Sequence, residues 1–480
     1  MEEVLPKNWV ETELGNILSA RKGKKPLALV EEIIEGYLPY ILIEQLEGKP
    51  YRLFTNDEKV VRIDKNEVIL VWDGSIGKCG SGFCGALGST FVAMNPLGGI
   101  PTKFLEYIII SKQNYIKETS TGVGLQHINK NFFKECLINL PPLAEQERIV
   151  AKLDKLFAQH ETIKKALDRI PQLLKDFRQQ VLTQAVTGKL TEEWRKTNKP
   201  NTYSFEELNK YREEVKKIYA SKNGKSKVVY KKSSEVKLGE NTKGIEYLYK
   251  IPDSWLWTNL DQVTWNISDG PHFSPKYVAE NEGKRFISMR NVNVNGVDFS
   301  DCKYVSVEDH NQFVKRGKPE IGDLLYTKGG STGIACVLDT DVDFSYWVHL
   351  ALLKVVKKSV NSIFLRNALN SPMCYKQSQA FTHGVGNQDL GLTRMIYIAF
   401  PLPPLKEQQE IVNRVESLFA KADKIEAKYK ALKAKVATLP QAILHKAFEG
   451  ELVPQLPTDG HAKDLLAEIM ALKNEVKKKK

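Results

Sequence analysis

The sequence predicts an α+β fold in which two α/β domains alternate with two long helices that pair as an antiparallel coiled coil. Two observations carry this prediction. Residues 122–190 align with residues 384–452 without a gap, at a constant offset of 262 and with 21 identities in 69 positions. A heptad pattern of apolar residues also runs through most of each repeated segment. The repeat therefore predicts two equivalent halves related by a pseudo-twofold axis.

The repeated segments, 141–190 and 403–450, each indicate one long helix. Nineteen of the twenty a and d positions of their heptads are apolar, which is typical of a coiled coil. The exception is His160, which we interpret as a packed residue of the seam and not as a ligand. The residues that we expect to form the seam or to dock a partner are Ile149, Leu153, Leu156, Ile163, Leu167, Ile411, Val415, Leu418, Ile425 and Leu432.

Residues at the ends of both segments support these helices. A proline pair precedes each segment and presets the first helical turn, and a glycine near the end is suited to stop the helix. Pro171 and Pro440 fall inside the segments at e positions, away from the seam, so we expect a kink at each and not two separate helices. The flanking residues are Pro141-Pro142 and Gly188 in the first copy, and Pro403-Pro404 and Gly450 in the second.

The remaining segments give the domain organisation. Between the helices, Ser204 and Glu207 have the spacing of a capping box and predict a short helix, while the lysine-rich run that begins at residue 221 indicates a flexible linker. The predicted boundaries are 1–140 for the first domain, 141–190 for the first long helix, 191–250 for the short helix and linker, 251–402 for the second domain, 403–450 for the second long helix and 451–480 for the tail.

The composition is that of an ordinary globular protein, with 42% hydrophobic and 27% charged residues in a chain of 480. No apolar stretch approaches 18 residues and the start carries no positive charge, so we expect a soluble, cytoplasmic protein with no membrane partner. The six cysteines are scattered. The closest two, Cys79 and Cys84, have no second pair or histidine to complete a zinc site, so we expect free thiols and no metal.

The net charge of +12 does not by itself locate a DNA-binding surface. Between Arg195 and Lys243 there are 14 basic and 6 acidic residues, and the tail Lys477–Lys480 supplies the rest of the excess. The two predicted domains are therefore close to neutral. If they contact phosphate groups, they must do so through local patches.

Several short motifs carry a resemblance to a known family. Each domain opens on a similar string, "LPKNW" at 5–9 and "IPDSW" at 251–255, and closes on "PPLAEQ" or "PPLKEQ". "AVTGKLTEEWR" follows the first helix and "KAFEGEL" the second. Together they resemble the specificity (S) subunit of type I restriction–modification systems. "DGPHFSP" at 269–275 is similar to a loop of that family's target-recognition domains, whereas the first domain has "ARKGKKP" at 20–26.

The resemblance implies a DNA-reading subunit and not a catalyst. Each target-recognition domain would read one half of a bipartite site on double-stranded DNA. The helices would set the gap between the halves and dock two modification (M) subunits, which bind S-adenosylmethionine and methylate adenine. Restriction (R) subunits, which use ATP and Mg, would complete the nuclease. This chain would bind none of these cofactors itself.

Base edges and phosphates are contacted by basic, amide and hydroxyl side chains on exposed loops. Glycine-rich or turn-prone stretches in both domains contain such residues. The candidates for DNA contact are Lys24, Lys25, Ser75 and Lys78 in the first domain, and His272, Arg290, Asn291, Lys328 and Ser331 in the second.

Other interpretations stay open at this point. The chain lacks the Asn/Asp-Pro-Pro-aromatic motif of amino-methyltransferases, a Walker-type loop and a recognisable nuclease motif. A self-sufficient DNA-modifying enzyme would need motifs that escape recognition. A coiled-coil scaffold with no DNA role, or the specificity subunit of a related multi-subunit or fused restriction system, would fit the same helices.

Overall fold

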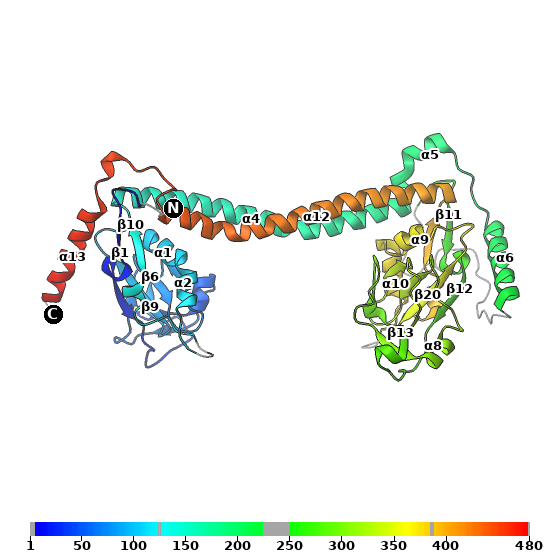
Figure 1. Cartoon of the computed structure of the whole chain (residues 1–480), viewed down its shortest axis with the longest axis horizontal. Coiled ribbons are helices and arrows are strands. Elements are labelled where there is room, and N and C mark those ends of the chain that lie inside the picture. The colour runs from blue at the N-terminus through cyan, green and yellow to red at the C-terminus, as the bar shows by residue number, and fades with distance from the viewer. Residues whose placement is uncertain (1–4, 123, 125, 224–249, 385–387, 479–480) are drawn as a thin grey trace. The chain divides into compact units, whose positions relative to one another are not determined.

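The computed structural model describes residues 5–122, 124, 126–223, 250–384 and 388–478. It divides into two compact units (Figure 1). Unit 1 comprises Met1–Arg169 and Tyr429–Lys480, and unit 2 comprises Ile170–Lys428. Each unit therefore holds one globular part and a portion of each long helix, whereas the sequence predicted the helices as segments separate from the domains. The predicted lysine-rich linker lies largely outside the described residues.

The globular part of unit 1 is built on two four-stranded sheets and one strand pair. One sheet has the order β2-β9-β6-β7 and the other the order β4-β3-β8-β5, while β1 pairs antiparallel with β10. Helix α1 (Thr102–Ser111) packs on the first sheet, followed by α2 (Gln113–Glu118) and α3 (Phe132–Glu135). The strands are β1 Val10–Glu13, β2 Leu18–Lys22, β3 Leu38–Ile41, β4 Phe54–Thr55, β5 Arg62–Ile63, β6 Val68–Val71, β7 Cys79–Ser81, β8 Gly85–Leu87, β9 Phe91–Pro96 and β10 Leu137–Leu140.

The globular part of unit 2 has a related set of sheets. The main sheet has the order β12-β20-β17-β18, a three-stranded sheet has the order β16-β13-β19, and two pairs are β11-β21 and β14-β15. The strands are β11 Leu256–Asn259, β12 Thr264–Asp269, β13 Gly283–Ile287, β14 Val292–Asn293, β15 Gly296–Val297, β16 Lys303–Ser306, β17 Leu324–Thr327, β18 Ala335–Val337, β19 Phe344–Tyr346, β20 Leu350–Val355 and β21 Ala399–Leu402. The helices are α7 Leu260–Val263, α8 Val307–Phe313, α9 Ser362–Leu369, α10 Pro372–Phe381 and α11 Leu392–Met395.

The two main sheets show that the repeat includes the globular parts. Both have four antiparallel strands in the same spatial order, and in both the second strand of that order is the last in the chain. The strands β6 (Val68–Val71) and β20 (Leu350–Val355) are buried at every residue. Alternate residues of each strand join a core with a helix (α1 or α9) on one face and a core with the second sheet on the other. The expected mixed α and β composition and the internal repeat are confirmed.

The long helices are α4 (Leu143–Thr187) and α12 (Leu405–Phe448), each continuous through its internal proline. Both begin directly after the proline pair, as predicted. In the first turn, Gln146 donates to the carbonyl oxygen of Pro141 at 2.8 Å, and Gln408 donates to that of Pro403 at 2.8 Å. The helix starts are therefore fixed by the same side-chain-to-backbone bond in both copies.

The contacts between the helices show that they run antiparallel. In unit 1, the His160 ring nitrogen Nε2 lies 3.0 Å from the carbonyl oxygen of Val436. In unit 2, Arg178 donates to Asp423 at 2.7 Å and to Glu426 at 2.9 Å. The partner's residue number falls as the number along α4 rises, which confirms the antiparallel coiled coil. His160 serves as a packing residue, as we expected.

The seam is narrower than the heptad pattern predicted. Apolar a positions such as Leu167 and Ala422 are buried along both helices. The d positions are buried only next to the globular parts, as Ile149 and Ile411 are, and become exposed farther along. We call the exposed d positions the outer stripe; its members are Ile163 (42% exposed), Phe177 (37%), Ile425 (51%), Leu432 (47%) and Leu439 (39%). The prediction that d side chains fill the seam is therefore wrong for these residues, because two helices alone cover only one side of each other.

A short helix after each long one extends the repeat farther than the sequence indicated. Gly188 and Gly450 have φ of +79° and +81°, and each long helix stops there. In unit 1, α13 (Ala462–Lys478) buries Leu465 and Ile469 against the globular core. In unit 2, α6 (Phe205–Asn223) follows α5 (Glu192–Asn198) and lies beside α7 and β12 (Figure 1).

Helix α6 buries Leu208 in the core of unit 2 and is also held by polar contacts. Arg212 of α6 is buried and donates to Asp261 at 2.5 Å and to the carbonyl oxygen of Thr264 at 3.1 Å. The predicted capping box of this helix is confirmed, because Ser204 and Glu207 exchange hydrogen bonds of 2.9 and 3.1 Å. None of the described helices is long and apolar enough to cross a membrane.

Candidate nucleic-acid interface

A glycine-rich turn and a short hairpin meet in the same way in each unit. In unit 1, the amide of Gly74 donates to the carbonyl oxygen of Gln126 at 2.9 Å, and the amide of Ile128 donates to that of Trp72 at 3.0 Å. In unit 2, Gly330 donates to Gln388 at 3.0 Å, and Leu390 donates to Lys328 at 2.7 Å. The turns carry the strings "GSIG" and "GSTG", and Gln126 and Gln388 end the strings "GVGLQ" and "GVGNQ" of the sequence. We call each pair the turn–hairpin element.

The flanks of the hairpins close in the same register. Thr121 bridges His127 in unit 1, and His383 bridges Asp389 in unit 2, each pair exchanging backbone hydrogen bonds of 2.8 to 3.0 Å. Gln126 and Gln388, the last residues of the two hairpin loops, have exposed side chains. Both units thus present an amide side chain from the same place in the fold.

The charged groups that support the turn–hairpin elements differ between the two units. In unit 1, Asp73 accepts a hydrogen bond from Lys22 at 2.5 Å and lies 2.7 Å from the ring nitrogen Nδ1 of His127. Partial burial raises the pKa of Asp73, but the hydrogen bonds from His127 and Lys22 outweigh it, so its pKa lies below the usual value. The element in unit 1 is therefore supported by a carboxylate that stays ionised and holds two partners.

In unit 2, a buried lysine takes the central place. The ammonium group of Lys328 is 3.1 Å from Asp389 and 3.6 Å from Asp269, and its side chain is 3% exposed. Asp269 is also within 3.2 Å of His272 and 3.1 Å of Arg316. This network joins the turn–hairpin element to the loop that starts at Asp269.

A cavity of about 430 Å³ lies beside the turn–hairpin element of unit 2. Arg290, Gly330 and Gln388 line it together with aromatic rings and Lys303. Arg290 is exposed, and neither Arg290 nor Lys303 forms an ion pair with another described residue. Exposed Arg and Gln side chains beside backbone amides are the groups that read base edges and hold phosphates.

Comparison with known proteins identifies the family. The model for the type I restriction modification DNA specificity domain matches residues 6–172 and 265–434. The chain belongs to this family of specificity subunits. The resemblance found in the motifs is thereby confirmed, and the chain is a DNA-recognition subunit of the type I restriction–modification kind.

Individual relatives agree with this assignment. The EcoBI specificity subunit of Escherichia coli is 30% identical over 355 residues, which cover 74% of this chain and 66% of that protein. The EcoDI specificity subunit of Escherichia coli is 29% identical over 467 residues, covering 94% and 90%. The HsdS subunit from Thermoanaerobacter tengcongensis has a TM-score of 0.56 at 18% identity, covering 93% and 98%, and so shares the fold.

The specificity subunit places the remaining predicted residues of its first globular part at the surface. Lys24, Lys25 and Ser75 are exposed, and Ser75 belongs to the turn of the turn–hairpin element. Lys78 is exposed as well, but its ammonium group is 2.8 Å from Glu47. Of these four, Ser75 is therefore the residue that the fold brings into the candidate interface.

In the second globular part, the loop at 269–275 lies next to the turn–hairpin element. Gly270 is required there, because a Cβ atom would come within 1.7 Å of the carbonyl oxygen of Tyr346. His272 and Phe273 project from this loop, and Phe273 is 61% exposed. Ser331, in the turn itself, is exposed. His272, Arg290 and Ser331 thus remain candidates for DNA contact.

Two predicted residues are not on the exposed loops where the sequence placed them. Asn291 is 7% exposed and donates to the carbonyl oxygens of Asp298 at 3.0 Å and Asp301 at 3.2 Å. Lys328 is buried between carboxylates. The expectation of exposed, unpaired side chains is wrong for both residues. Turn-prone sequences also contain residues whose side chains stabilise the loop itself, and Asn291 and Lys328 are such residues.

Sequence reasoning missed Gln126 and Gln388. The signal was present, since "GVGLQ" and "GVGNQ" are part of the repeat and each ends on a glutamine. His349 was also missed. It lines the cavity, and burial together with the neighbouring Lys328 lowers its pKa.

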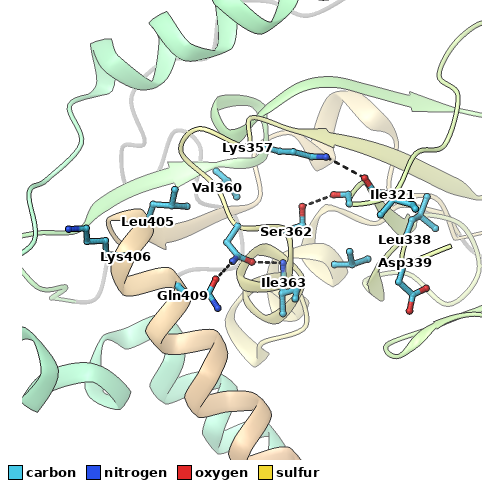
Figure 2. A pocket seen from close by; sticks show the side chains of 13 residues that line it. Ile321, Leu338, Asp339, Lys357, Val360, Ser362, Ile363, Leu405, Lys406 and Gln409 are labelled. Atoms are coloured by element: carbon cyan, nitrogen blue, oxygen red, sulfur yellow. Dashed lines mark hydrogen bonds between the residues drawn. The ribbon is translucent and has the colours of Figure 1, made fainter. Parts of the chain in front are cut away.

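A separate hollow of about 770 Å³ lies where α12 begins (Figure 2). It is lined by apolar residues such as Ile321 and Leu405, and Asn361 beside it donates to Gln409 at 3.0 Å. None of the predicted DNA-contact residues lines it. The described residues also contain no group of three or more His, Cys, Asp or Glu side chains that could hold a metal ion.

Proposed function

We propose that each unit reads one half of a bipartite site on double-stranded DNA through its turn–hairpin element. The observation that carries this proposal is the matched pair of backbone bonds, Gly74 to Gln126 and Gly330 to Gln388. They hold an exposed glutamine next to a serine-containing turn in both units. The two globular parts differ elsewhere in sequence but share this geometry. This is expected if both units bind DNA in the same orientation.

The side chains around the two elements differ, so the two half-sites should differ as well. His127 in unit 1 occupies the hairpin position that Asp389 occupies in unit 2, and Trp72 occupies the position of Lys328. A base edge that suits one arrangement of donors and acceptors does not suit the other. The proposed site is therefore asymmetric.

The outer stripe is the proposed docking surface for two methyltransferase (M) subunits. Unit 1 exposes Ile163, Leu432 and Leu439, and unit 2 exposes Phe177 and Ile425. Ile163 and Ile425 are equivalent in the repeat, as are Phe177 and Leu439, so the stripe exposes apolar side chains at two pairs of equivalent positions. Exposed apolar side chains at heptad spacing are suited to receive a helix of a partner. Of the predicted docking residues, Ile149, Leu153, Leu167, Ile411 and Val415 are buried inside their units, and Leu156 and Leu418 are half-buried.

The long helices are proposed to set the number of unread bases between the half-sites. The buried a positions fix the register of α4 against α12, and a helix of 45 residues is about 68 Å long. This exceeds the roughly 34–36 Å of one turn of B-DNA. Four residues inserted after Gly188 should alter the tolerated spacer while the bases on either side stay the same.

In this proposal the chain acts in the cytoplasm and supplies recognition alone. S-adenosylmethionine would be held by the M subunits, and ATP and Mg by restriction (R) subunits. Mixing the purified chain with its M subunits, DNA and S-adenosylmethionine tests the division of labour. Site-specific methylation should appear only in the mixture. Methyl transfer by this chain alone would contradict the proposal.

A further inference from the structure

Unit 2 contains a cavity of about 650 Å³ that lies apart from the turn–hairpin cavity. It is bounded by the C-terminal half of α4, by α9 and the start of α10, and by α12. Its volume is typical of pockets that bind small organic molecules. The wall includes the aromatic rings of Tyr375 and Phe419 and the charged side chains of Lys175 and Arg366.

The cavity carries positive charge that the protein does not neutralise. Arg366 is half-buried, and no described carboxylate lies within 4.0 Å of its guanidinium. Burial lowers its pKa, opposed only by the more distant charge of Glu416 and by Cys336. Lys175 has no ion pair with any described residue either. Arg178 also lines the cavity, but Asp423 and Glu426 already neutralise it.

A buried amide beside Arg366 has an unused donor. Asn367 is 3% exposed, and its Oδ1 accepts hydrogen bonds from Arg366 Nε at 3.2 Å and Nη2 at 3.0 Å. Its Nδ2 is buried and has no hydrogen-bond partner. Leaving a buried donor unsatisfied is unfavourable, so such groups normally have a partner. An anion with acceptor oxygens would satisfy Asn367 and Arg366 at once.

The internal repeat shows that protein side chains fill the same place in unit 1. Tyr107 of α1 stands where Asn367 stands in α9, and Phe157 of α4 stands where Phe419 stands in α12. In unit 1, the ring of Tyr107 lies 5.3 Å from that of Phe157, and its hydroxyl donates to Asp154. The smaller Asn367 leaves this space open in unit 2.

We infer that this cavity binds a phosphate-bearing nucleotide. Phosphate oxygens would accept from Arg366, Asn367 and Lys175, since guanidinium and ammonium groups bind phosphate strongly. The base would pack on Tyr375 and Phe419, since base–aromatic stacking tolerates every base. The nucleotide is either free in solution or part of the bound DNA, and the two sources share this chemistry.

Calorimetry on the full-length chain with AMP, ATP or inorganic phosphate tests the free source. The nucleotides should bind the wild-type chain. Arg366→Gln should weaken this binding at least tenfold, and Asn367→Tyr should abolish it by recreating the packing of unit 1. Lys357→Gln removes a cation of the other hollow and should change nothing. Thermal unfolding of each variant shows whether it is folded. If Asn367→Tyr does not fold, Arg366→Gln alone still tests the inference.

A second arm tests the DNA source and decides the remaining cases. If no free nucleotide binds, the same variants are assayed for DNA binding in the presence of M subunits. A loss in Arg366→Gln and Asn367→Tyr, with Lys357→Gln unaffected, assigns the cavity to a nucleotide of the DNA. Absence of an effect in both arms overturns the inference. The calorimetric arm does not depend on the proposed DNA-reading role, so the two can fail separately.

Discussion

Trp255 donates its indole Nε1–H to the carboxylate of Glu407 at 2.9 Å, and Trp9 makes the same hydrogen bond with Glu145, also at 2.9 Å. Both carboxylates are completely buried in the first turn of a long helix. Each bond fastens the start of a globular part to the start of the helix that follows it. A side-chain hydrogen bond therefore connects the motif that opens each domain with the motif that closes it.

Mutation of Glu407 and of Glu145 should lower the stability of the chain by different amounts. Glu407 also accepts hydrogen bonds from Arg195 at 2.6 Å and from Thr191 at 2.7 Å, whereas Glu145 accepts from the neutral Gln455 at 3.0 Å. Glu407→Ala leaves a partly buried cation unpaired and should lower the free energy of unfolding by about 3–5 kcal/mol.

Glu145→Ala leaves only neutral donors and should cost about 1–3 kcal/mol. Urea denaturation followed by tryptophan fluorescence measures both variants under the same conditions. A larger loss in Glu145→Ala would contradict the assignment of the charged contact in unit 2 as the stronger one.

Arg290 and Lys328 should respond in opposite ways, although the sequence offered both as DNA contacts. Arg290 is exposed and lines the cavity, so Arg290→Ala should leave stability within about 0.5 kcal/mol of wild type and should weaken modification by about 1–3 kcal/mol if the side chain reads a base. Lys328→Ala removes one of the cationic partners of buried Asp269, which keeps Arg316 and His272, and should cost about 1–3 kcal/mol of stability. Thermal unfolding and methylation assays on both variants separate the two roles. A stable Lys328→Ala protein with altered site choice would reverse our placement of this residue.

The paired glutamines allow each half-site to be tested against the other. Gln388→Ala should weaken recognition of one half of the DNA site, and Gln126→Ala should weaken recognition of the other half. If the amide contacts a base, the loss of binding free energy should be about 1–3 kcal/mol in each variant. Each variant serves as the control for the other. Methylation rates on a library with one half randomised at a time measure the effect. Loss of selectivity in the same half for both variants would show that the turn–hairpin elements are not two separate readers.

The outer stripe should bind M subunits without contributing to the fold of this chain. Ile425→Glu places a charge on a side chain that is 51% exposed, so the free chain should stay folded. Burying an isoleucine is worth about 1.5–3 kcal/mol, so the complex should weaken roughly tenfold or more. Ala427→Glu adds the same single negative charge at an exposed position two residues away and is the control. Sedimentation of each variant with M subunits measures the assembly, and equal assembly of both variants would remove the outer stripe as the docking surface.

The long helices were predictable because the heptad spacing, the proline pairs and the repeat agree with each other. The repeat alone allowed a parallel pair as well, and we favoured the antiparallel pair because a globular domain lies between the two helices in the chain. The exposure of the outer stripe did not, because a heptad pattern marks positions suited to burial and does not say how many partners are present. The equivalence of α6 and α13 in the repeat could not be recognised from the sequence. Arg212 of α6 pairs with Asp261, whereas Ile469 of α13 makes an apolar contact.

The candidate interface was only partly predictable. Gly-rich strings located the turns, and Ser75, Arg290 and Ser331 are where a loop would expose them. Asn291 and Lys328 lie in similar strings but are used to build the loops. The meeting of each turn with a hairpin that follows some 50 residues later is a tertiary contact, and no local pattern in the sequence encodes it.

The most direct measurement for the central claim is the methylated sequence produced by a domain exchange. Residues 251–402 are replaced by the corresponding residues of another specificity subunit, and the chimera is combined with the same M subunits. Genome-wide mapping of methylated adenine should then show one half of the recognised sequence changed, with the other half and the spacer as in the wild type. Two altered halves, or an unaltered sequence, would contradict the account of one reading head in each unit.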